Sequence, residues 1–300
     1  MQDKKQHKFS KKTRRLSSIL NDTYDHIRNL HDSKDGLTGI STGFDDLDEM
    51  TSGLQNGELI IVAARPSFGK TSLVLNIAEH VGIKEKKPVL IFSLEVSDKQ
   101  TAQNMLCSYA KIDAYLLRTG KLEDKQFPKL SSAIDDLSES DIFIDDTPGL
   151  DLLELCARAR HLKSQHNIEL IIIDYIQLME TVKTEDREQK ISDVSSGLKV
   201  LARELDIPVI AVSQLSRSVE TRKDHIPRVS DLKGTGAIAH ADLVLLLHRE
   251  DYYDPTANPG DVRIYIAKHR SGPTGFTTLT FQREFMKYVN YQPNISLDAD

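Results

Sequence analysis

The sequence predicts an α/β protein built on a mostly parallel, twisted sheet with helices on both faces. Short apolar runs alternate with longer helical patterns along the chain, and the runs are continuous, as in strands that are buried on both faces. These runs lie at 59–64, 89–94, 142–144, 170–174, 209–213 and 243–247. Beyond residue 261 the apolar period becomes two, at 262–266 and 276–281, which is typical of an antiparallel hairpin that closes the sheet.

Composition indicates a globular protein without a covalent framework. Of 300 residues, 39% are hydrophobic and 28% are charged. The two cysteines, Cys107 and Cys156, form no Cys-x-x-Cys pair, so we expect no zinc site or disulfides and a reducing, cytoplasmic location. The first residues lack the apolar core of a secretory signal, and no apolar run approaches the roughly 18 residues of a membrane-spanning helix. The net charge of −6 argues against a wholly nucleic-acid-binding surface but permits a local basic groove.

Three regions follow from the order of the patterns: a basic tail and amphipathic linker helix over 1–36, a main domain over 37–290, and a tail over 291–300. In the first region, apolar residues three or four apart predict a helix over 16–30, and a polar stretch closed by Gly36 predicts a linker. The basic cluster Lys4–Arg15 is open to two interpretations, a solvated face or a nucleic-acid contact. In the main domain, helices are expected over 71–81, 97–110, 150–164 and 187–205.

The strand 59–64 runs into a loop that is typical of phosphate binding. The stretch AARPSFGKTS at 63–72 retains the Gly-Lys-Thr half of the P-loop pattern, with Ala64 in place of the first glycine. A loop between a buried strand and a helix start aims several backbone N–H groups at one anion, and the helix dipole adds to the attraction. Lys70 would then reach the β- and γ-phosphates of a nucleotide, and the Thr71 hydroxyl would ligate Mg²⁺.

Three other strand ends carry polar residues to the same edge. Asp174 closes the strand LIIID and suits a carboxylate that holds Mg²⁺. Glu95 comes just after another buried strand, where it could act as a base for the attacking water, and Gln214 could donate to a γ-phosphate. Because the carboxyl ends of parallel strands meet at one edge, these residues are expected to converge with Lys70.

These stretches together resemble the ATPase domain of DnaB-type replicative DNA helicases over about residues 38–285. The resemblance is carried, in order, by ARPSFGKTS, FSLEVS, IDYIQLM, VSQLSRSVETR, SDLKGTGAI and IAKHRSGPTG. Ala64 in place of the first P-loop glycine is usual in that family. The resemblance implies a RecA-like P-loop NTPase fold, ATP and Mg²⁺ as cofactors, single-stranded DNA as a partner, and a homo-oligomeric, hexameric ring with a primase or helicase loader as further partners.

The resemblance also implies roles for single residues. Glu95 matches the catalytic glutamate, Gln214 the γ-phosphate sensor, and Thr71 and Asp174 the magnesium site. Arg270, with Lys268 beside it, matches the arginine finger inserted into the neighbouring subunit's site, whereas the residues alone would suggest two exposed bases on a strand. The nucleotide loop is expected to comprise Arg65, Pro66, Ser67, Phe68, Gly69, Lys70, Thr71 and Ser72.

The stretch Arg217–Gly236 matches the loops that hold single-stranded DNA in this family. The expected DNA-binding residues are Arg217, Arg222, Lys223, Lys233, Gly234, Thr235 and Gly236. Gly234 stands where the family has an acidic residue, and AIAHAD is one residue shorter than usual, so the detailed DNA contacts of the family are not carried over to this chain, whereas the ATPase site is. The bases of Arg217–Lys223 are also compatible with a plain solvated loop.

Two questions stay open at the level of sequence. Residues 1–36 are too short for the helical domain that normally precedes the linker, so the chain is expected to be either a fragment or a short version, and the helix over 16–30 could pack on a neighbouring subunit or on its own domain. The alternatives to a helicase motor are a RecA-type recombinase and a non-motor nucleotide-binding assembly factor. The SQLSR and KHRSGPTG stretches argue against the first, and Glu95 and Arg270 against the second.

Overall fold

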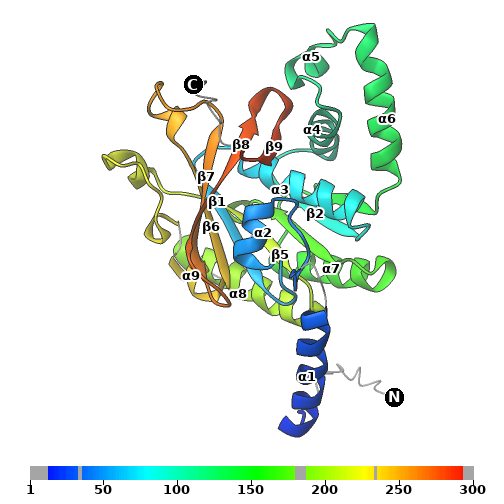
Figure 1. Ribbon diagram of the computed structural model, residues 1–300, viewed down its shortest axis with the longest axis vertical. Helices are drawn as coiled ribbons and strands as arrows, with labels where there is room; N and C mark the ends of the chain where they lie inside the picture. Colours follow the sequence, from blue (N-terminus) through cyan, green and yellow to red (C-terminus); the bar gives the residue numbers. More distant parts are fainter. Residues whose placement is uncertain (1–12, 33–35, 180–186, 233–234, 293–300) are drawn as a thin grey trace, which may run out of the picture. The chain divides into compact units, whose positions relative to one another are not determined.

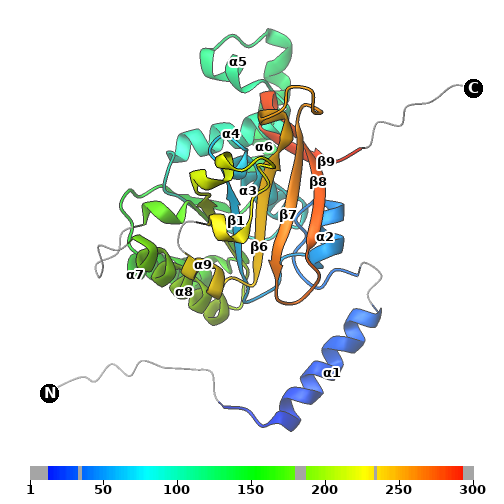
Figure 2. The same cartoon turned by 90° about the vertical axis from the view of Figure 1, so that its left-hand side faces the viewer.

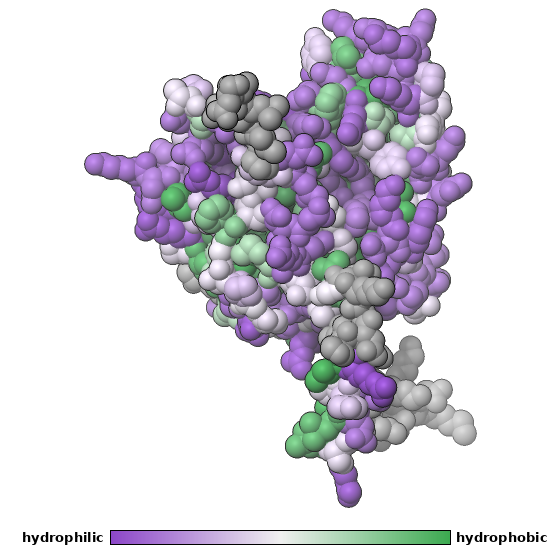
Figure 3. Space-filling view, viewed as in Figure 1, coloured by the Kyte–Doolittle hydropathy of each residue, from purple (hydrophilic) through white to green (hydrophobic). Residues whose placement is uncertain are grey.

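The computed structural model describes residues 13–32, 36–179, 187–232 and 235–292, which fall into two compact units, Met1–Thr38 and Gly39–Asp300. In the first unit, the helix expected over 16–30 is present as α1, Leu16–Asp32. Its sequence contains neither proline nor glycine, and its apolar residues recur at helical spacing. Five of them are 40–69% exposed, namely Leu16, Ile19, Leu20, Tyr24 and Ile27. Figure 3 shows apolar surface along α1.

In the second unit, the described strands form one nine-stranded sheet in the order β3-β2-β4-β5-β1-β6-β7-β8-β9 (Figure 1). The six parallel strands are β1 Leu59–Ala64, β2 Val89–Ser93, β3 Ile142–Asp145, β4 Leu170–Asp174, β5 Val209–Gln214 and β6 Leu243–Arg249. The antiparallel strands are β7 Asp261–His269, β8 Gly275–Gln282 and β9 Lys287–Asn290. The mostly parallel sheet and the closing hairpin are therefore confirmed, and β9 extends the hairpin by a strand that we did not predict.

The helices of this unit are α2 Asp45–Thr51, α3 Lys70–Glu79, α4 Asp98–Ala110, α5 Ala114–Thr119, α6 Phe127–Ser138, α7 Leu152–His166, α8 Arg187–Leu205 and α9 Thr235–His240. The four predicted helices correspond to α3, α4, α7 and α8. The pattern expected to continue to residue 81 does so as a π-helical turn, His80–Lys84, which directly follows α3. The other helices include short ones such as α5 and α9, which hold too few turns to show a clear period.

Two hydrophobic clusters lie on the two faces of the sheet. Ile60 and Val62 belong to the cluster that includes residues of α2, α3 and α4, whereas Leu59 and Ile61 belong to the cluster that includes residues of α7 and α8. Successive strand residues point to opposite faces, so a continuous apolar run supplies both clusters at once. Figure 2 shows α8 and α2 on opposite sides of the sheet. Within the described residues, no helix is long and apolar enough to cross a membrane.

Candidate active site

The loop between β1 and α3 has the backbone of an anion-binding turn. Ser67 and Gly69 adopt the left-handed conformation, with φ of 67° and 85°. A Cβ atom at Gly69 would lie 2.5 Å from the hydroxyl oxygen of Tyr288, so both the backbone angle and the space require glycine here. α3 begins at Lys70, and its first N–H groups have no partner within the helix. The loop therefore presents the amides and the lysine that bind phosphate.

The hydroxyl of Thr71 and the carboxylate of Asp174 meet across this loop. Thr71 Oγ1 donates a hydrogen bond of 2.6 Å to Asp174 Oδ2, which joins the start of α3 to the end of β4. Asp174 is only 5% exposed, and its Oδ1 is buried without a hydrogen-bond partner among the described residues. Burial raises the pKa of Asp174; the Thr71 hydrogen bond and the Lys70 charge oppose this rise, and the Glu95 charge adds to it.

Glu95 and Gln214 lie at the same edge of the sheet. Glu95 is exposed just beyond the end of β2, where its charge acts on Asp174, and Leu94 N donates to the Asp174 carbonyl over 2.7 Å. Gln214 is the last residue of β5 and lies opposite Ala64 of β1 in the parallel register. The structure thus brings together Lys70, Thr71, Glu95, Asp174 and Gln214, which the sequence scatters over almost half of the chain.

The donor atoms at this edge suit Mg²⁺. A carboxylate and a hydroxyl are hard oxygen ligands, and the unpartnered Oδ1 of Asp174 is a buried acceptor with unused capacity. Mg²⁺ is commonly held by one or two protein groups and completed by water and phosphate oxygens. The described residues contain no group of three or more His, Cys, Asp or Glu that could hold a metal by themselves.

The predicted nucleotide loop also contains side chains that point elsewhere. Arg65 is 7% exposed, and its guanidinium donates to Glu220 Oε1 and to the carbonyl oxygen of Leu215. Phe68 is 2% exposed and packs against Tyr252, with ring centroids 5.0 Å apart. Pro66 and Ser67 are exposed at the tip of the loop, and Ser72 is buried in α3. This guanidinium therefore has three protein contacts, two of them to Glu220. Contact of the Arg65 side chain with a nucleotide stays a prediction.

Tyr288 is a residue of the site that the sequence analysis missed. Its hydroxyl donates to the carbonyl oxygen of Phe68 over 3.0 Å, and its ring is fully buried against Phe281. Asn76 of α3 accepts a hydrogen bond of 2.6 Å from Tyr288 N, so β9 braces both the loop and the helix after it. Burial raises the pKa of Tyr288 far above its usual value. The four residues of β9 show too little alternation to identify Tyr288 as a buried strand residue, and no local pattern connects it with this loop.

Lys268 and Arg270 lie at the opposite edge of the sheet. Lys268 pairs with Val244 near the start of β6, and Arg270 follows β7 with its amide bonded to the carbonyl of Asp242. Arg270 Nη2 donates to the Ala239 carbonyl over 2.8 Å, and Lys268 Nζ donates to the Ile238 carbonyl over 2.5 Å. Burial lowers the pKa of Lys268, and the neighbouring Arg270 charge adds to this effect. A strand of six residues such as β1 is about 20 Å long, so Arg270 is remote from the P-loop of its own chain.

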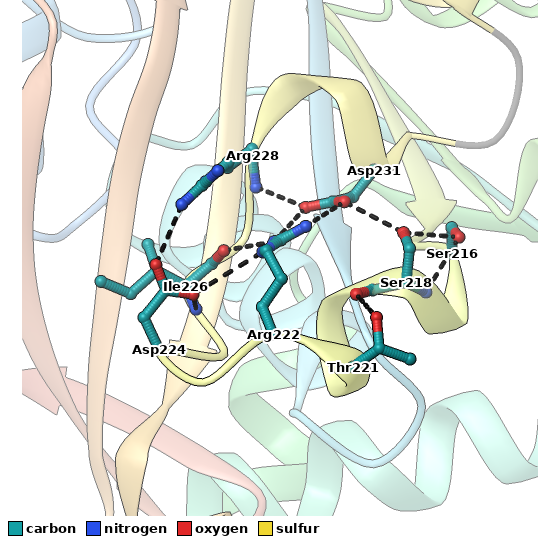
Figure 4. A network of polar contacts seen from close by, with 8 residues as sticks. All are labelled: Ser216, Ser218, Thr221, Arg222, Asp224, Ile226, Arg228 and Asp231. Carbon is teal, nitrogen blue, oxygen red and sulfur yellow. Dashed lines mark hydrogen bonds and ion pairs between the residues drawn. The ribbon is translucent and has the colours of Figure 1, made fainter.

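The predicted DNA-binding residues differ in how freely they are presented. Arg217 and Lys223 are exposed. Arg222 instead forms two hydrogen bonds of 2.7 and 2.6 Å with the carboxylate of Asp231 and another with the Ile226 carbonyl (Figure 4). Burial acts to raise the pKa of Asp231, but the bonds from Arg222 and the Arg228 amide hold it below its ordinary value. Lys233 and Gly234 lie outside the described residues, and Thr235 and Gly236 begin α9.

Comparison with known proteins places these features in one family. The family model for the DnaB-like helicase C terminal domain matches residues 39–290. The chain is 47% identical over 281 residues to the replicative DNA helicase DnaC of Bacillus subtilis (strain 168) and 47% identical over 291 residues to the replicative DNA helicase DnaB of Geobacillus stearothermophilus. These alignments cover 92% and 96% of this chain but only 62% and 64% of the two helicases.

Solved structures agree with the sequence comparison. An ATPase domain of known structure superimposes with a TM-score of 0.88 at 35% identity, covering 94% of this chain and all of that domain. A DnaB-like replicative helicase, described with its interactions with primase, gives a TM-score of 0.85 at 35% identity, covering 94% of this chain and 68% of that one. The predicted RecA-like helicase fold is confirmed. The chain belongs to the DnaB-like helicase C-terminal domain family.

Proposed function

We propose that this chain is the motor of a replicative DNA helicase, which hydrolyses ATP to move along single-stranded DNA and unwind the duplex. The observation that carries the proposal is the convergence of Lys70, Thr71, Glu95 and Asp174 at one sheet edge, with Asp174 Oδ1 left for a ligand. Family membership supports the helicase over a recombinase or a non-motor assembly factor. The division into a tail and linker helix over 1–36, a motor over 37–290 and a tail over 291–300 belongs to the same proposal.

Each side chain has a separate task in hydrolysis. Lys70 and the loop amides offset the charge of the β- and γ-phosphates. Glu95, exposed beside the site, accepts a proton from the attacking water, and Gln214 donates to the γ-phosphate from the end of β5. Thr71 and Asp174 would hold Mg²⁺, which neutralises charge on the phosphate oxygens when it is bound.

The position of Arg270 supports a shared site between copies. Its guanidinium is half exposed at the edge opposite the P-loop of its own chain, so it is available to the P-loop of a neighbour. A guanidinium supplied in trans stabilises charge in the transition state and ties hydrolysis to ring assembly. We therefore propose a homo-oligomeric, hexameric ring in the cytoplasm, with single-stranded DNA held through Arg217 and Lys223 and a primase or helicase loader as additional partners.

The test is ATP hydrolysis by the full chain with and without single-stranded DNA, combined with the molecular mass in solution. A DNA-stimulated ATPase that assembles into a ring is the expected result. Strand exchange in place of unwinding would favour the recombinase, and nucleotide binding without turnover under ring-forming conditions would favour the assembly factor.

A further inference from the structure

The loop that carries the P-loop motif is joined to the basic segment, which we define as residues 216–232, by an ion pair whose arginine is buried. Arg65 donates through Nε and Nη2 to Glu220 Oε1 over 2.9 and 2.8 Å, and through Nη1 to the Leu215 carbonyl over 2.8 Å. The Arg65 side chain is 8% exposed and that of Glu220 is 41% exposed. Separating them would leave a buried guanidinium without its counter-charge, so the two groups are held to move together.

A second contact joins the same two elements. The ring of Phe68 lies 6.0 Å from that of Tyr253, which stacks on the imidazole of His225 at 4.0 Å with only 10° between the planes. Arg65 and Phe68 flank the tip of the nucleotide loop, whereas Glu220 and His225 both belong to the basic segment. The loop and the basic segment are thus connected at both sides of the tip.

The basic segment is braced internally, so a displacement of Glu220 is carried through it. Asp231 accepts hydrogen bonds from both terminal nitrogens of Arg222, from the Ser218 hydroxyl and from the Arg228 amide (Figure 4). An antiparallel bridge between Leu215 and Leu232 closes the segment at its base. The exposed bases Arg217 and Lys223 lie three residues to either side of Glu220 and would move with this unit.

We infer that Arg65 and Glu220 are a pair of positioning residues through which nucleotide binding and DNA binding influence each other. The inference rests on the proposed function, which assigns ATP to the loop and single-stranded DNA to the basic segment. Neither residue needs to touch reacting atoms: a shift of the loop backbone on phosphate binding moves Glu220, and with it the bases that contact DNA. Thermodynamic linkage makes this effect reciprocal, so DNA changes nucleotide affinity by the same factor.

The experiment measures that factor directly. The dissociation constant of a fluorescent single-stranded oligonucleotide is determined for the full chain with and without a non-hydrolysable ATP analogue. Allosteric coupling typically amounts to a factor of about 5–150, and we expect the wild type to lie in this range. Glu220→Gln removes the counter-charge at almost unchanged size. The ratio of its two oligonucleotide dissociation constants, without and with the analogue, should fall to within about twofold of one.

Glu204→Gln is the matched control. Glu204 forms a bidentate pair with Arg160 at 2.8 Å and is 45% exposed, close to the 41% of Glu220, but it links α7 to α8 instead of the loop to the basic segment. This variant should keep the wild-type ratio. If Glu220→Gln melts at a lower temperature than the control, the double variant Arg65→Met/Glu220→Gln is measured in its place. Removing both charges leaves no buried charge without a partner.

A wild-type ratio in Glu220→Gln or in the double variant would overturn the inference, as would a wild type whose ratio is one. A different result would contradict the proposed function: wild-type protein that neither binds the oligonucleotide nor shows DNA-stimulated ATP hydrolysis. A wild type with stimulated hydrolysis and an uncoupled Glu220→Gln supports both.

Discussion

Two buried aspartates at opposite edges of the sheet show how this fold separates a reactive site from a structural one. Asp174 and Asp242 are each 5% exposed. Asp242 accepts from Lys199 Nζ at 2.6 Å and from Leu59 N at 2.8 Å, and lies 3.4 Å from Arg270 Nη1. Asp174 has only the Thr71 hydroxyl and a buried oxygen without a partner among the described residues. At equal burial, the underpaired carboxylate is the one prepared for a ligand, because desolvation of a charge must be offset by some partner.

The largest effect is expected from Arg270→Ala, which removes the cation beside Asp242. An arginine finger contributes roughly 10³–10⁵ in rate, so hydrolysis should nearly cease while ATP affinity is retained. Steady-state ATPase and nucleotide-binding titrations measure the two quantities. Arg263→Ala is the control, since Arg263 lies on β7, the strand that Arg270 directly follows, is 43% exposed and pairs with Glu250.

Action in trans is tested by placing Lys70→Ala and Arg270→Ala on one chain and mixing it in rising amounts with wild type. Activity should fall faster than the wild-type fraction, because each inactive copy loses its own P-loop and also the finger that it would supply to the site of its neighbour. A strictly linear decline, with subunit exchange verified, would refute the assignment in trans.

At the carboxyl edge, Glu95→Gln should retain ATP binding and lose turnover by roughly 10²–10⁴, the usual contribution of a general base. The amide cannot accept a proton from water. Glu169→Gln is the control at the amino end of β4, where Glu169 forms a 3.8 Å pair with Lys87. Equal hydrolysis by Glu95→Gln and wild type would show that Glu95 has no part in proton transfer.

The comparison of the two aspartates predicts opposite effects of the same substitution on stability. Asp242→Asn should destabilise the fold by about 3 kcal/mol, because it leaves the largely buried ammonium of Lys199 beside a neutral amide. Chemical denaturation of the two Asp→Asn variants at neutral pH measures this. A loss no larger than in Asp174→Asn would mean that the pairing of Asp242 contributes little.

The smallest effect is the change in stability expected from Asp174→Asn, which should stabilise the metal-free protein by about 1 kcal/mol at neutral pH. Burial raises the pKa of Asp174 above its ordinary 3.8, so the folded state binds the proton more tightly than the unfolded state. Stability from this group is therefore full below pH 3.8 and is lost as the pH rises through the higher folded-state pKa. The gain from Asp174→Asn should appear over the same range in melting curves recorded without Mg²⁺, and a constant difference across pH would contradict it.

Much of the fold and the core of the site could be predicted from local patterns. Continuous apolar runs identified all six parallel strands, since five of them are buried on both faces and β3, which is only partly buried, keeps an apolar run of three residues. The Gly-Lys-Thr turn and the polar residues after β2, β4 and β5 indicated a common edge, because parallel strands all end there. β9 was missed, since four residues after a turn show too little alternation to be recognised.

What the sequence determined by itself is the set of groups at the carboxyl edge; what only the tertiary structure decided is how each is paired. Asp174 and Asp242 both end or begin an apolar run, yet contacts from distant residues leave one underpaired and saturate the other. Contacts of Arg65 with nucleotide and of Arg222 with DNA stay predictions, and the fold pairs their guanidiniums with Glu220 and Asp231. Tyr288 reaches the P-loop from 220 residues away. The physical reason is that an ion pair or hydrogen bond depends on which atoms the fold places within about 3 Å, and local periodicity carries no information about such long-range neighbours.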